Sequence, residues 1–257
     1  MDTMFGIAQI DHRQVRVQYL GVSLITSLLL RRDHDDDLFV KCQTLSPWTT
    51  NYVDFEESLA VGSIAQEILA HSGVLMEWAG LDKDQKDRRI FARSASDWKV
   101  TELSFFSADS WPELICGAYL LTQASKITVN ALMADSNDNE RSLKLVHSEQ
   151  LLHLSHWRRW ITILLADADT ELDVNSALRT VLDRAGDIFA SSTGVIGDLK
   201  KSWIVDVKAD FKQWGVSLDP VAVVEKSRTT GGSNVEKMVF DLGFVRTADG
   251  SPEYSVY

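Results

Sequence analysis

The chain contains 257 residues, of which 45% are hydrophobic and 25% charged, and its net charge is −11. This hydrophobic content suffices to bury a core and excludes a disordered chain. The acidic balance argues against a nucleic-acid partner, since phosphate binding requires clustered lysine and arginine. Only four prolines occur, where average usage of about 5% would give roughly thirteen. Long helices are therefore favoured over a β-sandwich or barrel, which needs frequent turns.

The first apolar segment, residues 17–30 (VQYLGVSLITSLLL), carries no charge. It is too short to span about 30 Å of hydrocarbon, and it lacks the basic start and the cleavage site of a signal peptide. We therefore expect a buried helix and no membrane partner. The two cysteines, Cys42 and Cys116, lie far apart and outside any metal-binding spacing, which is typical of reduced thiols in the cytoplasm.

An acidic run, Asp33-His34-Asp35-Asp36-Asp37, follows this segment. Such a cluster can attract a divalent cation, but a solvated loop is the commoner outcome for a run of charges. We therefore expect this run to close the first helix and to open a polar connector that extends to Asn51.

The rest of the chain alternates long helical patterns with polar breaks. Gly80 ends the first of these patterns, Pro112 marks the first turn of the second, and the polar residues 136–139 separate the second from the third. Because this last break is short, the helices on either side of it should be antiparallel neighbours. The predicted helices cover about residues 54–78, 112–134, 140–166, 172–190 and 193–213, and a looser tail follows.

These helices predict an all-α fold, a ferritin-like four-helix bundle with additional C-terminal helices. We expect a single domain, 1–257, with the bundle core at about residues 13–166 and the C-terminal helices and tail at residues 171–257. Long connections after the first two helices and a short turn after the third indicate at least one crossover, as in ferritin-like bundles.

Polar residues interrupt the core line of the predicted helix 140–166. Stepping three and four residues in turn from Leu143 gives a mostly apolar line that also contains Gln150 and His153. These two residues have the spacing of the Glu-x-x-His motif of di-iron bundles. Gln150 stands where the glutamate would be, and a neutral amide cannot offset the charge of the iron ions.

The predicted helix 54–78 carries a similar polar group. Glu67 and His71 lie on or beside its core line, four residues apart. A di-iron helix would need a glutamate at the position of Ile64 and a histidine at the position of Glu67. The spacing suits a single metal ion better than a di-iron half-site.

The other two bundle helices decide whether a di-iron site can form, because each must supply a carboxylate. Residues 15–32 contain no Asp or Glu, and neither do residues 114–134. The latter helix instead contributes Lys126, a cation that a metal cluster would repel. We therefore expect no catalytic residue, no metal and no other cofactor in this chain.

Two interpretations of the polar residues stay open. In the first, Gln150 and His153 hydrogen-bond to each other or to Glu67, and Lys126 pairs with a carboxylate, which gives a polar network where a metal would otherwise lie. In the second, Glu67, His71 and His153 form a degenerate mononuclear metal site. We favour the network.

Three stretches of the chain resemble one known family: residues 54–80 (DFEESLAVGSIAQEILAHSGVLMEWAG), residues 117–160, which include NALMADSNDNERSLKLVHSEQLLHLSHWRRW, and residues 203–220 (WIVDVKADFKQWGVSLDP). In helix order, in the Glu-x-x-x-His motif from Glu149 to His153 and in the turn at Met133, the chain resembles the PaaC-type subunit of the bacterial phenylacetyl-CoA epoxidase. That subunit is a ferritin-like protein. The resemblance spans about residues 54–220.

This resemblance implies a division of labour between two subunits. In the family, a catalytic sister subunit holds the di-iron site, whereas the PaaC-type subunit has lost it and supports the catalytic subunit in a heterodimer. The sister's metal ligands fall here on Ile64, Glu67, Leu121 or Thr122, Gln150 and His153. Only His153 keeps a ligand type, so the resemblance implies the structural subunit.

The C-terminal part departs from the family pattern. Gly231-Gly232-Ser233-Asn234 is followed by Glu236 and Met238, and the family's His-Thr-Glu turn is absent. The first 50 residues also lack a clear match. Because these parts can shape the surface that meets a partner, a different partner and pathway stay open.

Three functions are compatible with these observations. The first is a non-catalytic structural subunit of a multicomponent di-iron oxygenase acting on an aromatic acyl-CoA, bound to the catalytic di-iron subunit in a heterodimer or larger complex. The second is a ferritin-like oxidase with a degenerate metal site. The third is a stand-alone helical interaction protein, which predicts a homo-oligomer. The missing carboxylates favour the first.

Other residues carry weaker signals. Arg158 and Arg159 are expected on the outer side of their helix, where a solvated face is favoured over contact with a CoA phosphate or a partner carboxylate. Trp157 and Trp160 are expected in the core. Gly231-Gly232 does not form a phosphate loop, because it follows no strand and lacks the Lys-Ser or Lys-Thr of such loops.

Overall fold

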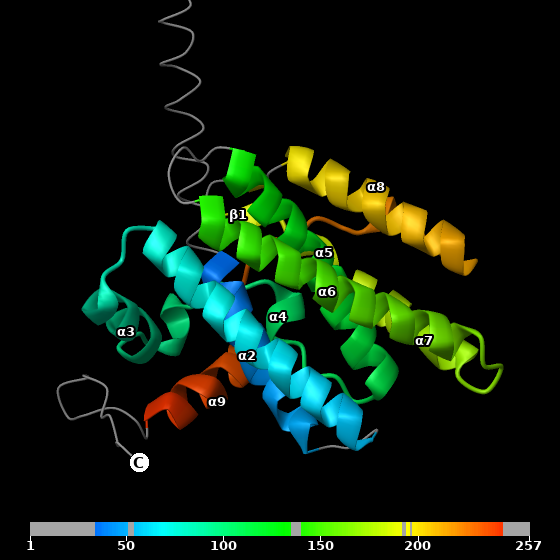
Figure 1. The fold of residues 1–257 in the computed structure, drawn as a ribbon, viewed down its shortest axis with the longest axis horizontal. Coiled ribbons are helices and arrows are strands. Elements are labelled where there is room, and N and C mark those ends of the chain that lie inside the picture. The colour runs from blue at the N-terminus through cyan, green and yellow to red at the C-terminus, as the bar shows by residue number, and fades with distance from the viewer. Residues whose placement is uncertain (1–33, 51–53, 135–139, 192–193, 196, 244–257) are drawn as a thin grey trace, which may run out of the picture.

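The computed structural model describes residues 34–50, 54–134, 140–191, 194–195 and 197–243. Within these residues the protein is almost entirely helical (Figure 1). Residues 34–45 form a helix, called helix 34–45 here. It is followed by α2 (Phe55–Trp78), α3 (Lys83–Phe91), α4 (Glu102–Phe105), α5 (Trp111–Ala134), α6 (Glu140–Leu165), α7 (Glu171–Leu182), α8 (Gly197–Trp214) and α9 (Gly232–Leu242). The predicted all-α, ferritin-like fold is confirmed. In the described residues its core is formed by α2, α5 and α6 together with helix 34–45, which lies where a connector was predicted.

Short elements connect these helices. The 3₁₀ turns are η1 (Ser46–Thr49), η2 (Ala95–Asp97), η3 (Ala185–Asp187) and η4 (Pro220–Ala222). Two strands of two residues each, β1 (Ala190–Ser191) and β2 (Gly194–Val195), pair antiparallel between α7 and α8. The apolar run 17–30 and the predicted turn 136–139 lie outside the described residues.

The long bundle helices begin and end close to the predicted positions, because their boundary signals are local. Asp54 caps α2, its side chain accepting a hydrogen bond from the backbone N–H of Glu57 at 2.7 Å. After α2, Gly80 adopts a φ of 82°, which favours glycine. Helices α5 and α6 agree with the predicted ranges to within about a residue, a margin smaller than the usual uncertainty of helix ends.

Helix α5 is the centre of the core. It contacts α6, α7 and α8, and its side chains are buried around most of its circumference. The predicted core residue Trp157 of α6 is fully buried, while Trp160 is partly buried against the same cluster. Such a position explains why α5 has so few charged residues, since a helix that is covered on every side is apolar on every side.

The acidic run is not a loop, and this prediction was wrong. Residues 34–37 form the first described turn of helix 34–45, and their side chains are buried. Each of the three aspartates is held by an arginine from elsewhere in the chain. These pairs are Asp35 with Arg89, Asp36 with Arg93, and Asp37 with Arg228.

These ion pairs have close geometry. Arg89 donates to both carboxylate oxygens of Asp35 at 2.8 Å, and Arg228 donates to both oxygens of Asp37 at 2.7 Å. Burial raises the pKa of Asp35 to about 7 and that of Asp37 to about 6, although the arginines act in the opposite direction. The run therefore joins helix 34–45 to α3 and to the C-terminal part of the chain.

The predicted helix 172–190 is shorter than expected. Helix α7 ends at Leu182, because the chain then turns to bring Gly186 against a C-terminal segment. A Cβ on Gly186 would lie 2.0 Å from the backbone oxygen of Val224. The next residue, Asp187, is buried and accepts a hydrogen bond from the Thr101 hydroxyl at 2.6 Å.

Two regions expected to lack helix are helical. The charged run after Gly80 forms α3, which starts with a capping box between Asp82 and Gln85. The Gly-rich tail forms α9, whose Val235 and Met238 pack in a second core cluster with Trp98. The C-terminal region is therefore packed on the bundle rather than loosely attached.

Candidate functional site

Two Glu-x-x-x-His motifs on neighbouring helices face each other. Helix α2 carries Glu67 and His71, and α6 carries Glu149 and His153. The pairing is reciprocal: His71 Nε2 lies 2.6 Å from Glu149 Oε2, and His153 Nε2 lies 2.6 Å from Glu67 Oε2. Each helix therefore supplies a histidine to the other helix's glutamate.

A third contact continues the same row. His156 Nε2 of α6 lies 3.3 Å from Glu57 Oε2 of α2. Residue numbers rise along α2 as they fall along α6, so the two helices run antiparallel. We call the three pairs His71–Glu149, His153–Glu67 and His156–Glu57 the His–Glu seam.

The seam histidines are held in the neutral form. Burial lowers the pKa of His71 and His153, and the hydrogen bonds to Glu149 and Glu67 only partly offset it. A neutral imidazole that donates its Nε2 proton to a carboxylate leaves Nδ1 as an acceptor. Nδ1 of His71 has no hydrogen-bond partner in the part of the chain that the structure describes. The two rings are stacked, with centroids 5.7 Å apart.

A small cavity lies beside the seam, inside the bundle. Its volume is about 10 Å³, which is roughly one water molecule by the same measure. The network interpretation allowed a hydrogen bond between Gln150 and His153. Gln150 instead donates to Ser125 Oγ on α5, and His153 bonds to Glu67. The lining residues come from all four bundle helices: Leu38, Lys41, Ile68, His71, Leu121, Thr122, Ser125, Gln150 and His153.

Lys41 of helix 34–45 is the lysine that lines the small cavity. It is buried, its ammonium has no ion-pair or hydrogen-bond partner among the described residues, and burial lowers its pKa to about 8. Sequence reasoning missed it because residue 41 was expected in a connector. Lys126 pairs with a carboxylate, as the network interpretation expected, but this carboxylate is on α8 and not in the site: Lys126 donates to Asp206 Oδ2 at 2.6 Å.

The other predicted positions also have clear locations. Glu67, His71, Gln150 and His153 meet in one region, and Ile64 is buried in the apolar core. Glu149 was part of the quoted motif but not of the predicted site, although its Glu-x-x-x-His spacing matches that of Glu67 and His71.

Beside the cavity, Ser125, His34 and Asp37 superficially resemble a catalytic triad. His34 Nε2 lies 2.9 Å from Ser125 Oγ, and His34 Nδ1 lies 4.0 Å from Asp37 Oδ2. However, burial and the charge of Arg228 lower the pKa of His34 to about 3, which makes it a poor base at neutral pH. The adjoining cavity also has no room for a substrate.

The residues present do not fit a di-iron pair, which takes a carboxylate from each of four helices. On α5 the side chains that line the cavity include Leu121 and Thr122, and the aspartates of helix 34–45 are bound to arginines. The residues also do not form the mononuclear metal site considered above, because the Nε2 atoms of His71 and His153 each bind a different carboxylate. In the described part of the chain, no three His, Cys, Asp or Glu side chains are grouped as a metal ion requires.

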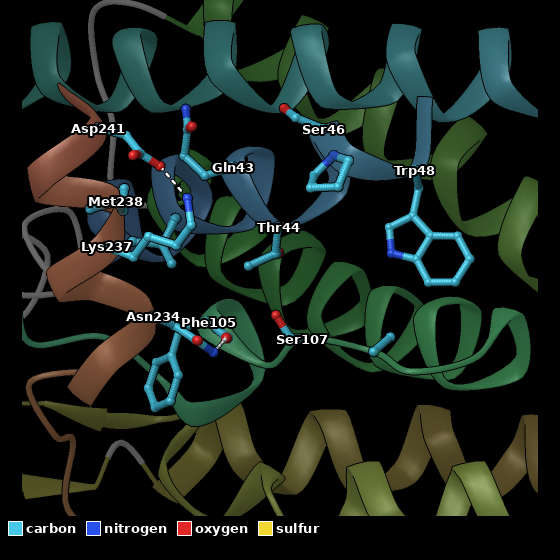
Figure 2. Close-up of a pocket in the computed structure, with 13 residues that line it drawn as sticks. Gln43, Thr44, Ser46, Trp48, Phe105, Ser107, Asn234, Lys237, Met238 and Asp241 are labelled. Carbon is cyan, nitrogen blue, oxygen red and sulfur yellow. Dashed lines mark hydrogen bonds and ion pairs between the residues drawn. The ribbon is translucent and has the colours of Figure 1, made fainter. Parts of the chain in front are cut away.

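A larger cavity, of about 440 Å³, lies elsewhere, between η1, helix 34–45 and α9 (Figure 2). None of the seam residues lines it. Its charged lining residues, Lys237 and Asp241, form an ion pair at 2.6 Å, and Asn234 donates to the backbone oxygen of Phe105 at 2.9 Å. These groups satisfy one another and give no indication of a ligand.

Arg158 has a structural contact, contrary to the solvated position expected for it. Its guanidinium donates to Asp210 Oδ2 of α8 at 2.8 and 3.0 Å, and the Tyr119 hydroxyl donates to the same oxygen at 2.6 Å. Arg159 is exposed, as expected. The Arg158–Asp210 ion pair therefore holds α8 against α6, whereas Arg159 lies in solvent.

Comparison with known proteins agrees with this fold. Residues 24–217 match the family described as phenylacetic acid catabolic protein, of the PaaA/PaaC type. No significant match was found among curated proteins. Since the matched region covers well over half of the sequence, the chain belongs to the PaaA/PaaC family of phenylacetic acid catabolic proteins.

Proposed function

We propose that this chain is the non-catalytic structural subunit of a multicomponent di-iron oxygenase that acts on an aromatic acyl-CoA. In this proposal a second family member, the catalytic subunit, binds the iron and carries out the reaction. The family match places the chain among phenylacetic acid catabolic proteins but does not separate the two subunit types.

The observation that carries the proposal is the His–Glu seam. Two imidazole nitrogens, His71 Nε2 and His153 Nε2, are each bound to a glutamate of the facing helix at 2.6 Å. The carboxylates are used in the same bonds. The hydrogen bonds thus join α2 to α6 at the level where a di-iron protein would join them through metal ions.

Two further features support the loss of catalysis. The α5 side chains beside the seam are Leu121, Thr122 and Ser125, none of which is a strong iron ligand. Lys41 also borders the cavity, and its positive charge would oppose the binding of a cation. A subunit with these features contributes to a complex by binding its partner rather than by reacting with substrate.

Co-purification tests this proposal. The tagged chain would be co-expressed with a PaaA/PaaC family member that carries Glu-x-x-His on two helices and a carboxylate on each of the other two. The proposal expects a stable complex in which iron is retained, and in which replacing the partner's iron ligands removes all of it. Failure to associate with such a partner, or iron that persists after the partner's ligands are replaced, would contradict it.

A further inference from the structure

The outer side of α2 is unusually poor in charge. From Ser58 to Met76 its only Asp, Glu, Lys or Arg residue is Glu67. Leu59 and Leu69 are 56% and 42% exposed. By length and composition α2 could even cross a membrane, although 44% of that apolar window is buried in the bundle. A helix that is apolar all round is expected to be covered on all sides.

The neighbouring α6 has the same character. From Leu145 to Trp157 its only charged residue of these four types is Glu149. Leu145 is 59% exposed and Leu152 is 69% exposed. Of the twelve large hydrophobic side chains that are exposed in the described residues, seven belong to α2 and α6: Phe55, Leu59, Leu69, Leu145, Leu151, Leu152 and Ile163.

The His–Glu seam holds the two helices side by side. On α6, Leu145, Glu149 and Leu152 follow the i, i+4, i+7 spacing of one helix face. On α2, Ser63, Glu67 and Ala70 have the same spacing and are all at least partly exposed. We call these six residues, together with Leu59, the α2–α6 face.

Two carboxylates lie within this otherwise uncharged surface. The Glu67 side chain is 43% exposed and that of Glu149 is 27% exposed. Depletion of charged residues from a surface is the compositional sign of an interface core, whereas a solvated helix face carries many charges. Exposed leucines of this number on two adjacent helices also mark an interaction site.

We infer that the α2–α6 face binds a second, non-identical helical chain, which presents an apolar surface with lysine or arginine opposite Glu67 and Glu149. This inference rests on the proposed function, because the occupant is the catalytic partner. Charge argues against a second copy of the same chain. A symmetric pair would place four carboxylates of the face together, between two chains that each carry a net charge of −11.

Charge insertion on the face tests the inference. Leu152→Glu and, independently, Leu145→Glu place a carboxylate at an exposed position, so folding should persist, which circular dichroism and the melting temperature verify. The matched control is Val205→Glu, a helical residue that is 65% exposed on α8, a helix that Figure 1 shows apart from α2. Each chain is assayed for binding to the co-expressed di-iron family member.

The inference expects both face variants to weaken binding by about ten-fold or more, and Val205→Glu to bind as the wild type does. Binding of the wild type should also weaken as salt rises, since charges face each other. If the wild type binds its partner and the face variants bind equally well, the inference is overturned while the proposed function stands. If the wild type binds no such partner, both are overturned.

Two further results would assign the face to another occupant. Sedimentation of the wild-type chain alone as a dimer that Leu152→Glu dissociates would show that a second copy covers it. Co-flotation of the wild type, but not of Leu152→Glu, with phosphatidylcholine vesicles would show a lipid surface instead. Either result would overturn the inference.

Discussion

Removal of Glu149 should destabilise the protein through His71, whose only hydrogen bond to another described residue is the one to this glutamate. The His71 side chain is 2% exposed, and its Nδ1 already lacks a partner. Glu149→Ala therefore leaves a buried imidazole with no partner at either nitrogen. Because an unsatisfied buried donor that had bonded to a charged group loses about 2 to 3 kcal/mol, we expect this reduction in the free energy of unfolding.

Two variants isolate the hydrogen bond from other effects of the substitution. Glu149→Gln retains an acceptor oxygen and should lose only about 1 kcal/mol. The double variant His71→Phe/Glu149→Leu replaces both partners with apolar groups, and it should be less destabilised than Glu149→Ala alone. With the single variants His71→Phe and Glu149→Leu, this double variant completes a double-mutant cycle. The difference between the destabilisation of the double variant and the sum for the two single variants measures the coupling between the two side chains.

The measurement is urea unfolding at pH 7.5, followed by far-ultraviolet circular dichroism and by tryptophan fluorescence. Glu77→Ala on α2 is the control, because Glu77 bonds to Lys86 at 2.8 Å while its side chain is 66% exposed. An ion pair in such a position contributes about 0.5 kcal/mol or less. If Glu149→Ala is no more destabilised than Glu77→Ala, the seam does not hold α2 to α6 and the reasoning is refuted.

The remaining predictions concern pH, the buried ion pairs and one glycine. The seam histidines have a lowered pKa in the folded protein, so their contribution to stability should fall as pH drops below about 6.5, and this loss should be smaller in the double variant described above. Asp35 and Asp37 have a raised pKa in the folded protein and act in the opposite direction. Urea titrations at pH 7 and pH 5 are therefore compared between the wild type and the double variant, and an equal change in the free energy of unfolding in both would refute this. Asp37→Ala removes the carboxylate partner of the buried Arg228 guanidinium and should cost about 3 to 5 kcal/mol in unfolding free energy, and a loss under 1 kcal/mol would contradict this. Gly186→Ala should lower the melting temperature, because the added Cβ would lie 2.0 Å from a backbone oxygen. Gly73→Ala should raise the melting temperature, because no atom lies within 4 Å of its added Cβ. A higher melting temperature for Gly186→Ala than for Gly73→Ala would contradict this packing.

The parts of the fold that sequence predicts here are those with local signals. Helices α2, α5 and α6 follow from periodicity, from the Asp54 cap and from Pro112, all of which act within a few residues. The acidic run was misinterpreted because its stabilising partners are remote: Arg89 is 54 residues from Asp35, and Arg228 is 191 residues from Asp37. Without those arginines, a run of aspartates would indeed be solvated.

The site was predictable to a similar degree. Glu67, His71 and His153 were found because each interrupts an apolar line. Lys126 was placed on the wrong side of α5, since a helix that is buried on nearly every side does not reveal which side faces the bundle centre. The reciprocal pairing of the two Glu-x-x-x-His motifs depends on the register of α2 against α6, which no local pattern specifies.

Iron content after anaerobic loading tests the central claim most directly. The isolated chain would be incubated with ferrous iron, desalted and analysed for metal, next to a His153→Ala variant. Because His71 Nε2 and His153 Nε2 are each hydrogen-bonded to a glutamate of the facing helix, we expect well under one iron per chain and no difference between wild type and variant. Two irons per wild-type chain, or about one iron that His153→Ala abolishes, would contradict the proposed role as a non-catalytic subunit.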